Sequence, residues 1–311
     1  MTILHGDCLQ HMLKLKSHDF QADAIITDPP YGLKMMGNQW DAPGNVAFRP
    51  DTWKLALDLL PPGGMLAAFG APKTYHRMAC AIEDGGFEIR DCVMWLFGNG
   101  FPKNQNLLKP AYEPIILARK PGALRRLNID ECRIEVAEGD VRSGGFDQGH
   151  GFWVKGERGN TVTVGAELGR YPANVVHDGS DDVLDAFAVH GERKTSGQKT
   201  AGARRYNGMF GDIPDGHHYG DTGTAARFYY CSKVRGAERL SHPTQKPLSL
   251  MQWIVRLITP SDGMVLDPFA GTGTTVVAAL NEGRRAIGIE SDPLYYVEAL
   301  NRFQSHAVAA E

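Results

Sequence analysis

Short apolar segments alternate with segments of helical spacing at both ends of this 311-residue chain, and this alternation constrains the fold most strongly. Residues 22–27 and 65–70 are mostly apolar runs, the pattern of strands buried on both faces of a parallel sheet. Between them, residues 51–60 carry apolar side chains on one helical face. Strands that alternate with helices predict an α/β protein with a doubly wound, mostly parallel sheet.

The same alternation continues through the rest of both regions. Further strands are expected at 2–5, 88–97, 113–118, 264–266 and 285–289, and further helices at 72–84, 248–258, 276–281 and 293–303. Between residues 121 and 235 glycine becomes frequent and only short strand-like pieces remain, at 161–164 and 173–176. We therefore expect one α/β domain made of 1–120 and 236–311, and a second domain made of 121–235.

The composition is that of a globular protein without a membrane-spanning segment. Hydrophobic residues make up 42% and charged residues 22% of the chain, and no run of about 18 apolar residues occurs. The five cysteines form no CxxC pair, which favours reduced thiols in a cytoplasm over disulfides. The eleven histidines show no metal-ligand spacing, so no metal is expected. The amino terminus lacks the layout of a signal peptide.

One stretch, residues 191–211, is basic although the whole chain has a net charge of −3. Its five cations stand against one acid, with a tyrosine nearby: Arg193, Lys194, Lys199, Arg204 and Arg205, then Glu192 and Tyr206. Such a segment suits a loop that follows a phosphate backbone. A solvated loop without that function is the alternative interpretation.

An acid, two prolines and a tyrosine follow the strand at 22–27, namely Asp28, Pro29, Pro30 and Tyr31. Open α/β sheets bind ligands at the carboxyl ends of their strands. Prolines fix φ and lack an N–H, so this loop offers a carboxylate and carbonyls as acceptors beside an aromatic ring. That set suits a planar group with an exocyclic amine. A proline-rich strand exit, with Asp28 as a helix cap, is the alternative.

A second strand end has the features of a nucleoside site. Strand 264–266 is followed by Asp267 and by a turn with Gly271 and Gly273, where small residues let the backbone approach a ligand. Glu290 ends the next strand about 20 residues later, where ribose hydroxyls are usually bound. The third glycine of a dinucleotide fingerprint is absent, and Asp267 would repel a pyrophosphate but suit an ammonium. A nucleoside that carries an amino acid is S-adenosylmethionine.

Three motifs together resemble the amino-group DNA methyltransferases, in the subgroup whose catalytic motif precedes its cofactor motif. They are DPPYGL at 28–33, HPTQKP at 242–247 and DPFAGTGTT at 267–275. The segments LNIDECRI, GRYPANVVHD and ARFYYCSK also resemble phage-like members. The resemblance covers about 1–120 and 236–311.

The resemblance implies the fold of class I S-adenosylmethionine-dependent methyltransferases. Their sheet has seven strands in the order 3-2-1-4-5-7-6, with strand 7 antiparallel. Here the amino-terminal strand would be the third and 264–267 the first. The region 121–235 would be the target recognition domain.

The catalytic roles that the resemblance implies belong to the first motif. Asp28 and the carbonyl of Pro29, held by Pro30, accept hydrogen bonds from the target amine, and Tyr31 stacks on a flipped base. The two acceptors draw the amine nitrogen towards tetrahedral geometry, which frees a lone pair otherwise delocalised into the ring, and the carboxylate stabilises the cation that forms. Cytosine-C5 chemistry would need a cysteine nucleophile, typically in a Pro-Cys pair, and the chain contains no such pair.

The cofactor-binding residues that the resemblance implies surround S-adenosylmethionine. Asp267 would meet the methionine ammonium and Glu290 the ribose hydroxyls, while Lys246 beside Thr244 would face the methionine carboxylate. The cofactor turn and the contacts at the adenine end complete the set: Phe269, Ala270, Gly271, Thr272 and Gly273, then Asp7 and Cys8.

The resulting hypothesis is a cytoplasmic enzyme, encoded by a bacterium or a phage, that acts as a homodimer on double-stranded DNA and methylates adenine N6. Asp at the head of the catalytic motif favours adenine, whereas cytosine-N4 enzymes more often carry Ser, so cytosine N4 is the alternative. A DNA-binding regulator without catalysis is a further alternative. RNA and protein-glutamine methyltransferases usually carry NPPY after the cofactor motif and are therefore disfavoured.

Overall fold

The structure is a computed structural model that describes residues 2–34, 37, 40–98, 100, 106, 108–123, 125–135, 169–189, 191–194, 222–232 and 245–309. The chain divides into two compact units. The first consists of Met1–Cys132, Asn174–Val183 and Cys231–Glu311, and the second of Arg133–Ala173 and Leu184–Tyr230.

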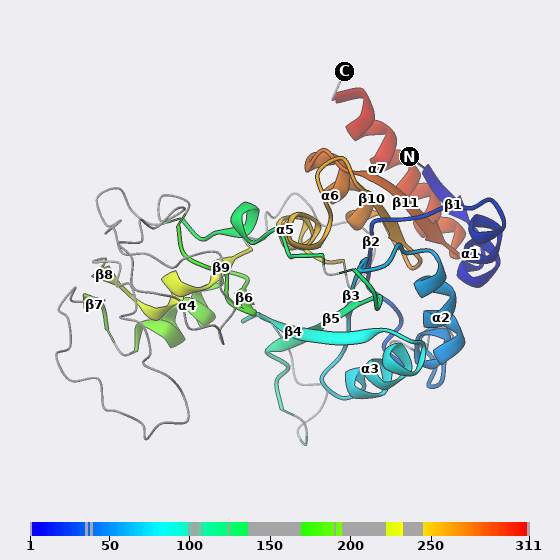
Figure 1. Cartoon of the computed structure of the whole chain (residues 1–311). Coiled ribbons are helices and arrows are strands. Elements are labelled where there is room, and N and C mark those ends of the chain that lie inside the picture. The colour runs from blue at the N-terminus through cyan, green and yellow to red at the C-terminus, as the bar shows by residue number, and fades with distance from the viewer. Residues whose placement is uncertain are drawn as a thin grey trace, which may run out of the picture. The chain divides into compact units, whose positions relative to one another are not determined.

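A sheet with the strand order β1-β11-β10-β2-β3-β5-β4-β6-β9 organises the first unit (Figure 1). In this order the strands are Thr2–His5, Arg285–Glu290, Met264–Asp267, Ala24–Thr27, Met65–Phe69, Tyr112–Arg119, Glu88–Leu96, Val175–His177 and Tyr230–Cys231. The first five strands in this order, β1, β11, β10, β2 and β3, pair in parallel, and β5 is antiparallel to both of its neighbours. The first seven strands therefore have the predicted order 3-2-1-4-5-7-6, and β6 and β9 extend it by two short strands.

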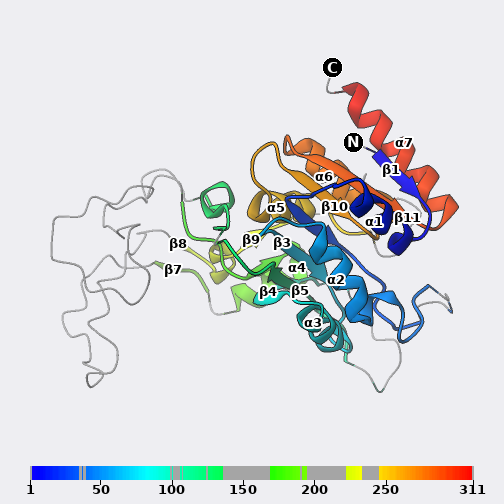
Figure 2. The same cartoon turned by 45° about the vertical axis from the view of Figure 1, so that its right-hand side comes forward.

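Helices cover both faces of this sheet (Figures 1 and 2). On one face lie α1 (Cys8–Ser17), α2 (Pro50–Asp58) and α3 (Tyr75–Asp84), and on the other α5 (Leu248–Ile258), α6 (Thr274–Asn281) and α7 (Pro293–Ala309). Every residue of β2 and β3 is buried between these layers. The mostly apolar composition of these two strands is what a strand covered on both faces requires.

The helix starts follow from local chemistry. The Asp7 side chain accepts a hydrogen bond from the Gln10 amide at 2.9 Å and caps α1. Pro50 lies in the first turn of α2, where its missing N–H is not needed. Helix α6 begins at Thr274, two residues before the predicted start, directly after Gly273 with φ 78°. Glycine adopts this left-handed conformation without the strain that a side chain would add.

The second unit has little regular structure among its described residues. Ile134 and Arg170 form an isolated antiparallel bridge, and β7 (Arg193–Lys194) pairs with β8 (Thr222–Gly223). The expected strand-like piece at 161–164 lies outside the described residues. The piece expected at 173–176 is strand β6, two residues further along, and its register against β4 places it in the sheet of the first unit.

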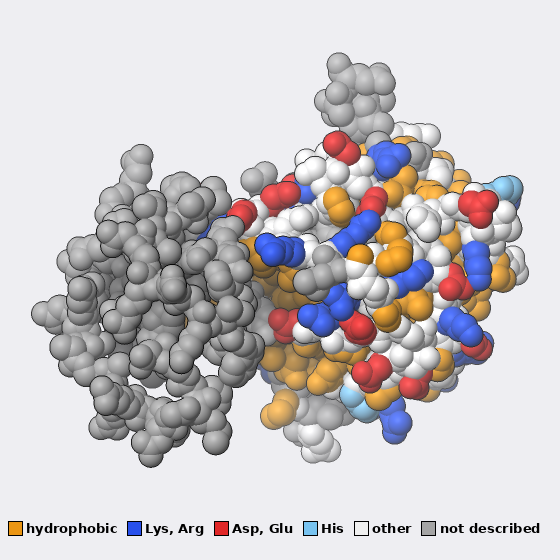
Figure 3. Space-filling model, viewed as in Figure 1, with side chains coloured by type: hydrophobic (Ala, Val, Ile, Leu, Met, Phe, Trp, Pro, Cys, Tyr) orange, Lys and Arg blue, Asp and Glu red, His pale blue; other side chains and the backbone are white. Residues whose placement is uncertain are grey.

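Basic and acidic side chains are interspersed over the described residues visible in Figure 3. No area of a single charge dominates that face of the first unit. In the described ranges, no helix combines the length and the apolar character that crossing a membrane requires.

Candidate active site

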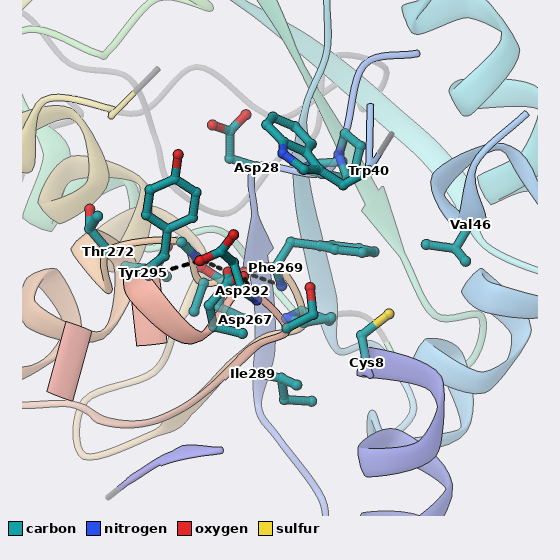
Figure 4. A pocket seen from close by; sticks show the side chains of 18 of the residues that line it. Cys8, Asp28, Trp40, Val46, Asp267, Phe269, Thr272, Ile289, Asp292 and Tyr295 are labelled. Carbon is teal, nitrogen blue, oxygen red and sulfur yellow. Dashed lines mark hydrogen bonds between the residues drawn. The ribbon is translucent and has the colours of Figure 1, made fainter. Parts of the chain in front are cut away.

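A cavity of about 370 Å³ opens at the carboxyl ends of the parallel strands, which is within the usual range for small-molecule sites. Its walls bring together most of the residues singled out in the sequence (Figure 4). They are Asp7, Cys8, Asp28, Pro29, Pro30, Tyr31, Lys246, Asp267, Phe269, Ala270, Gly271, Thr272 and Glu290. Gly273 shapes the turn behind this wall, and Thr244 lies outside the described residues.

Two backbone carbonyls of the loop after β2 accept hydrogen bonds from neighbouring side chains. Asn45 Nδ2 donates to the Pro30 carbonyl at 3.3 Å, and Thr74 Oγ1 donates to the Tyr31 carbonyl at 2.8 Å. No group in the described part of the chain donates to the carbonyl of Pro29, which borders the cavity. The Pro29 carbonyl at the cavity, next to Asp28 in the chain, is therefore available as an acceptor for a ligand.

A buried acid fixes the exit of the same loop. The Asp41 carboxylate accepts hydrogen bonds from the Gly32 amide at 2.7 Å and from the Leu33 amide at 3.2 Å. Asp41 is only 1% exposed, so both oxygens serve structure. In the sequence, Asp41 belongs to an irregular polar stretch, and nothing local indicated this contact.

Asp28 belongs to a cluster of four polar side chains. Its Oδ1 accepts a hydrogen bond from the Tyr31 hydroxyl at 2.7 Å, and its Oδ2 accepts one from Lys246 Nζ at 2.7 Å. Glu113, from β5, places its Oε2 3.0 Å from the Tyr31 hydroxyl and 3.2 Å from Lys246 Nζ. The cluster therefore pairs one ammonium with two carboxylates.

The surroundings of Lys246 keep it protonated. Burial acts to lower the pKa of Lys246, but the charges of Asp28 and Glu113 and their hydrogen bonds raise it above its ordinary value. The ammonium also lies 5.3 Å from the Tyr31 ring centroid and 5.0 Å from that of Phe69. Burial beside the two carboxylates raises the pKa of Tyr31, so its hydroxyl stays neutral.

This position of Lys246 differs from what the motif suggested. The resemblance places it opposite a cofactor carboxylate, whereas in the structure it forms ion pairs with two carboxylates of the protein. Its contact with the cofactor stays a prediction. The ion pair with Asp28 had no local signal, because the two residues belong to motifs at opposite ends of the chain.

Asp267 lies at the base of the cavity, at the end of β10 (Figure 4). Its Oδ1 accepts hydrogen bonds from Thr27 Oγ1 at 2.6 Å and from the Phe269 amide at 3.0 Å. Asp267 is 2% exposed, and burial raises its pKa to about 6 despite these hydrogen bonds. A buried carboxylate that borders a cavity is matched electrostatically by a ligand cation.

Glu290 ends β11 and holds the glycine turn in place. One carboxylate oxygen accepts a hydrogen bond from the Gly271 amide at 2.7 Å, and the other accepts one from the Asp292 amide at 2.7 Å. Burial raises its pKa above the ordinary value of a glutamate. The Ser291 amide is a further backbone donor to this carboxylate, and because a carboxylate has about four lone pairs, acceptor capacity remains for a ligand hydroxyl.

Apolar side chains line one part of the cavity. Cys8 at the start of α1, Val46 and Ile289 contribute side chains there (Figure 4). Burial raises the pKa of Cys8 to about 12, so this thiol is neutral and acts as an apolar group. A flat aromatic group such as a purine suits a wall of this kind.

Other residues of the cavity were missed in the sequence, namely Trp40, Val46, Arg49, Asp292 and Tyr295. Asp292 and Tyr295 follow directly after Glu290, so proximity in the chain could have indicated them. Trp40, Val46 and Arg49 belong to the connection between β2 and α2, whose path no local pattern reveals.

The basic stretch can be followed only in part. Arg193 and Lys194 form strand β7 of the second unit. Lys199, Arg204, Arg205 and Tyr206 lie outside the described residues. Their role in binding DNA stays a prediction.

Comparison with known proteins identifies the family to which the chain is similar. A family model described as DNA methylase, of the N6/N4 type, matches residues 22–301. Type II methyltransferase M2.DpnII of Streptococcus pneumoniae is 23% identical over 98% of this chain and 90% of its own length. Type II methyltransferase M.ScaI of Streptomyces caespitosus is 38% identical over 76 residues, which span 24% of this chain and 25% of that protein.

Solved structures share the fold. M1.HpyAVI in complex with SAM aligns over 97% of this chain and 98% of its own, with a TM-score of 0.54 and 20% identity. The cytosine-N4-specific PvuII DNA methyltransferase aligns over 97% of this chain and 86% of its own, with a TM-score of 0.54 and 15% identity.

Proposed function

The chain belongs to the N6/N4 family of DNA methylases, and from this premise we propose that it methylates adenine N6 in double-stranded DNA. The observation that carries the proposal is the acceptor pair at the cavity: the Asp28 carboxylate beside the uncommitted carbonyl of Pro29. Two acceptors side by side match the two N–H groups of an exocyclic amine.

The cavity fits S-adenosylmethionine, the methyl donor of this family. Asp267 offers a buried carboxylate to the methionine ammonium, Glu290 has lone pairs for the ribose hydroxyls, and the wall around Cys8 suits the adenine. Gly271 and Gly273 have φ of 53° and 78°, so the turn between β10 and α6 follows a path that residues with side chains rarely take. When bound, the cofactor supplies an electrophilic methyl group.

The residues of this chain act on the amine that receives the methyl group. Asp28 and the Pro29 carbonyl hold its two hydrogens, so that its lone pair points at the methyl carbon. The cation that forms on the amine is stabilised by the Asp28 carboxylate, which then takes up the departing proton. The Tyr31 ring borders the cavity at this point and offers a face for stacking.

The choice of adenine as the target base depends on one residue, the acid at position 28. The acid at position 28 favours adenine N6, because cytosine-N4 enzymes more often have Ser there. Cytosine N4 is the second candidate, since the family comprises both chemistries and the similar PvuII enzyme is cytosine-N4-specific. The two bases present the same amine chemistry to Asp28 and Pro29.

DNA recognition would fall to the region 121–235, which contains the second compact unit. Its basic stretch, with Arg193 and Lys194 at its start, would follow the phosphates. A homodimer is part of the proposal, as is action on DNA of the bacterial nucleoid or of a phage.

The experiment combines activity with identification of the product. The purified protein is incubated with radiolabelled S-adenosylmethionine and unmethylated plasmid DNA, and the DNA is then hydrolysed for mass spectrometry. We expect label in DNA and N6-methyladenine in the hydrolysate. N4-methylcytosine alone would replace the base and keep the mechanism, whereas no label in DNA would contradict the proposed function.

A further inference from the structure

Glu113 lies in the antiparallel strand β5, which β3 separates from β2, and it reaches the catalytic loop although it belongs to none of the three motifs. Its side chain is 22% exposed, and it lies near the start of β5. One oxygen, Oε2, is within hydrogen-bonding distance of both groups that hold Asp28: the Tyr31 hydroxyl at 3.0 Å and Lys246 Nζ at 3.2 Å. Glu113 is therefore placed to compete with Asp28 for the same two donors.

The number of protons that Tyr31 and Lys246 can donate determines whether both carboxylates can be hydrogen-bonded at once. A tyrosine hydroxyl has one proton, so Tyr31 donates either to Asp28 Oδ1 at 2.7 Å or to Glu113 Oε2 at 3.0 Å. An ammonium has three protons, so Lys246 can serve Asp28 and Glu113 together. When Tyr31 donates to Asp28, both oxygens of Asp28 have a resident donor.

Each Asp28 oxygen has a second lone pair, but an oxygen without a resident donor is the stronger acceptor for the target amine and is free to turn towards it. If the Tyr31 O–H rotates to Glu113, Asp28 Oδ1 loses its resident donor while Lys246 still holds Oδ2. No heavy atom has to move, because the hydroxyl oxygen is already within reach of both carboxylates. Tyr31 is only 9% exposed, so without Glu113 its hydroxyl would lose a hydrogen bond when it releases Asp28, which is unfavourable for a buried polar group.

We propose that Glu113 is a positioning residue for methyl transfer, and that it accepts the hydrogen bond of the neutral Tyr31 hydroxyl so that Asp28 Oδ1 is released to bind the target amine. The inference rests on the proposed function and deepens it. Lys246 forms ion pairs with both carboxylates and so keeps Asp28 and Glu113 in place while the Tyr31 hydroxyl changes its acceptor. Glu113 acts through Tyr31 and Lys246 and makes no contact with the cofactor cavity among the described residues.

The first test is Glu113→Gln, which keeps the shape and removes the charge. We expect the rate of methyl transfer to unmethylated plasmid DNA to fall by about tenfold or more, since an amide is a weaker acceptor than a carboxylate. The affinity for S-adenosylmethionine, measured by calorimetry, should stay within about twofold, because Glu113 does not line the cavity. Glu113→Asp, which keeps the charge, should recover part of the lost rate.

Glu88→Gln is the matched control. Glu88 lies in the adjacent strand β4 and forms an ion pair with Arg119 at the other end of β5. The substitution therefore also removes a carboxylate from an ion pair of this sheet, but away from the catalytic loop. We expect it to leave the rate unchanged. A Glu113→Gln variant with the wild-type rate would contradict the inference.

A double variant tests whether Glu113 acts through the Tyr31 hydroxyl. In Tyr31→Phe, Asp28 Oδ1 has no resident donor to release, so Glu113→Gln should cost clearly less there than in the wild type, about threefold or less. Equal costs in both backgrounds would overturn the inference. If the wild-type protein methylates no DNA, the proposed function fails; if it is active and Glu113→Gln is harmless, only the inference fails.

Discussion

Lys246 Nζ lies 2.7 Å from Asp28 Oδ2, although 218 positions separate the two residues in the chain. Asp28 follows β2, and Lys246 precedes α5, so the contact joins the motifs of the two ends of the chain. Lys246 is 6% exposed and has two carboxylate partners. A cation held in this way orients the Asp28 carboxylate, which we propose as the acceptor of the target amine.

Lys246→Met should therefore reduce methyl transfer more than cofactor binding. Without the ammonium, Asp28 and Glu113 repel each other in a partly buried place, and we expect a rate loss of about 10²-fold or more. Calorimetry with S-adenosylmethionine should give an affinity within about tenfold of the wild type. A collapse of cofactor affinity would instead place Lys246 at the methionine carboxylate. Lys16→Met, which removes an exposed ion pair with Asp58, is the control and should change neither quantity.

Asp28→Ala should abolish most of the turnover and leave the cofactor site intact. Loss of one preorganised polar contact in the transition state costs on the order of 10²-fold or more in rate. The measurement is labelled methyl transfer to DNA, with cofactor affinity determined in parallel. Near-normal turnover would show that Asp28 is not the acceptor for the amine.

Asp267→Ala and Glu290→Ala should each weaken the binding of S-adenosylmethionine, by about 1–3 kcal/mol for a hydrogen bond to a charged group. Circular dichroism should confirm that both variants are folded, since Glu290 also holds the Gly271 amide. Unchanged affinity in both variants would mean that the nucleoside site lies elsewhere.

Burial raises the pKa of Asp267 to about 6, so if Asp267 binds the methionine ammonium, cofactor affinity should depend on pH. The methionine ammonium pairs only with the ionised carboxylate, so below the pKa a proton must first be lost, at a cost of about 1.4 kcal/mol per pH unit. We expect roughly tenfold weaker binding at pH 5 than at pH 7. In Asp267→Asn this dependence should disappear, apart from any part due to Glu290, and an identical profile in that variant would refute the assignment.

Asp41→Asn tests whether the buried Asp41 carboxylate holds the catalytic loop in place, a contact that we call the Asp41 clamp. The Asp41 carboxylate accepts hydrogen bonds from the amides of Gly32 and Leu33, and an amide side chain can replace one of these bonds only. We expect a loss of unfolding free energy of about 1–3 kcal/mol and a lower rate of methyl transfer at unchanged cofactor affinity. Thermal unfolding gives the first quantity. Asp51→Asn, an exposed acid in the first turn of α2, is the control. Equal melting temperatures for Asp41→Asn and wild type would contradict the clamp.

Replacement of Arg204 and Arg205 by Ala tests the basic stretch. If both cations contact phosphates, DNA affinity should fall and the salt dependence should flatten by roughly one unit of slope per lost contact. Cofactor affinity should not change, because the cofactor cavity is lined by residues of the first unit alone. An unaltered affinity and slope would indicate a solvated loop.

Features that depend on residues close together in the chain could be predicted from the amino-acid sequence. Alternating apolar runs predicted the parallel strands, and Asp28, Asp267 and Glu290 were identified because each directly follows or ends a strand. The carboxyl ends of parallel strands meet at one edge of a sheet, so strand position alone brought these three acids to one cavity. The motif resemblance supplied the strand order, which the structure confirms.

The surroundings of these acids became visible in the folded protein and could not be predicted from local sequence. Glu113 lies within a strand, and it reaches Tyr31 because β5 pairs antiparallel with β3 next to β2, a pairing that no local pattern contains. The Asp41 clamp and the Asp28–Lys246 ion pair likewise depend on chain paths through irregular segments. Local sequence specifies backbone conformation over a few residues, whereas the partners of a buried charge are set by the packing of distant elements.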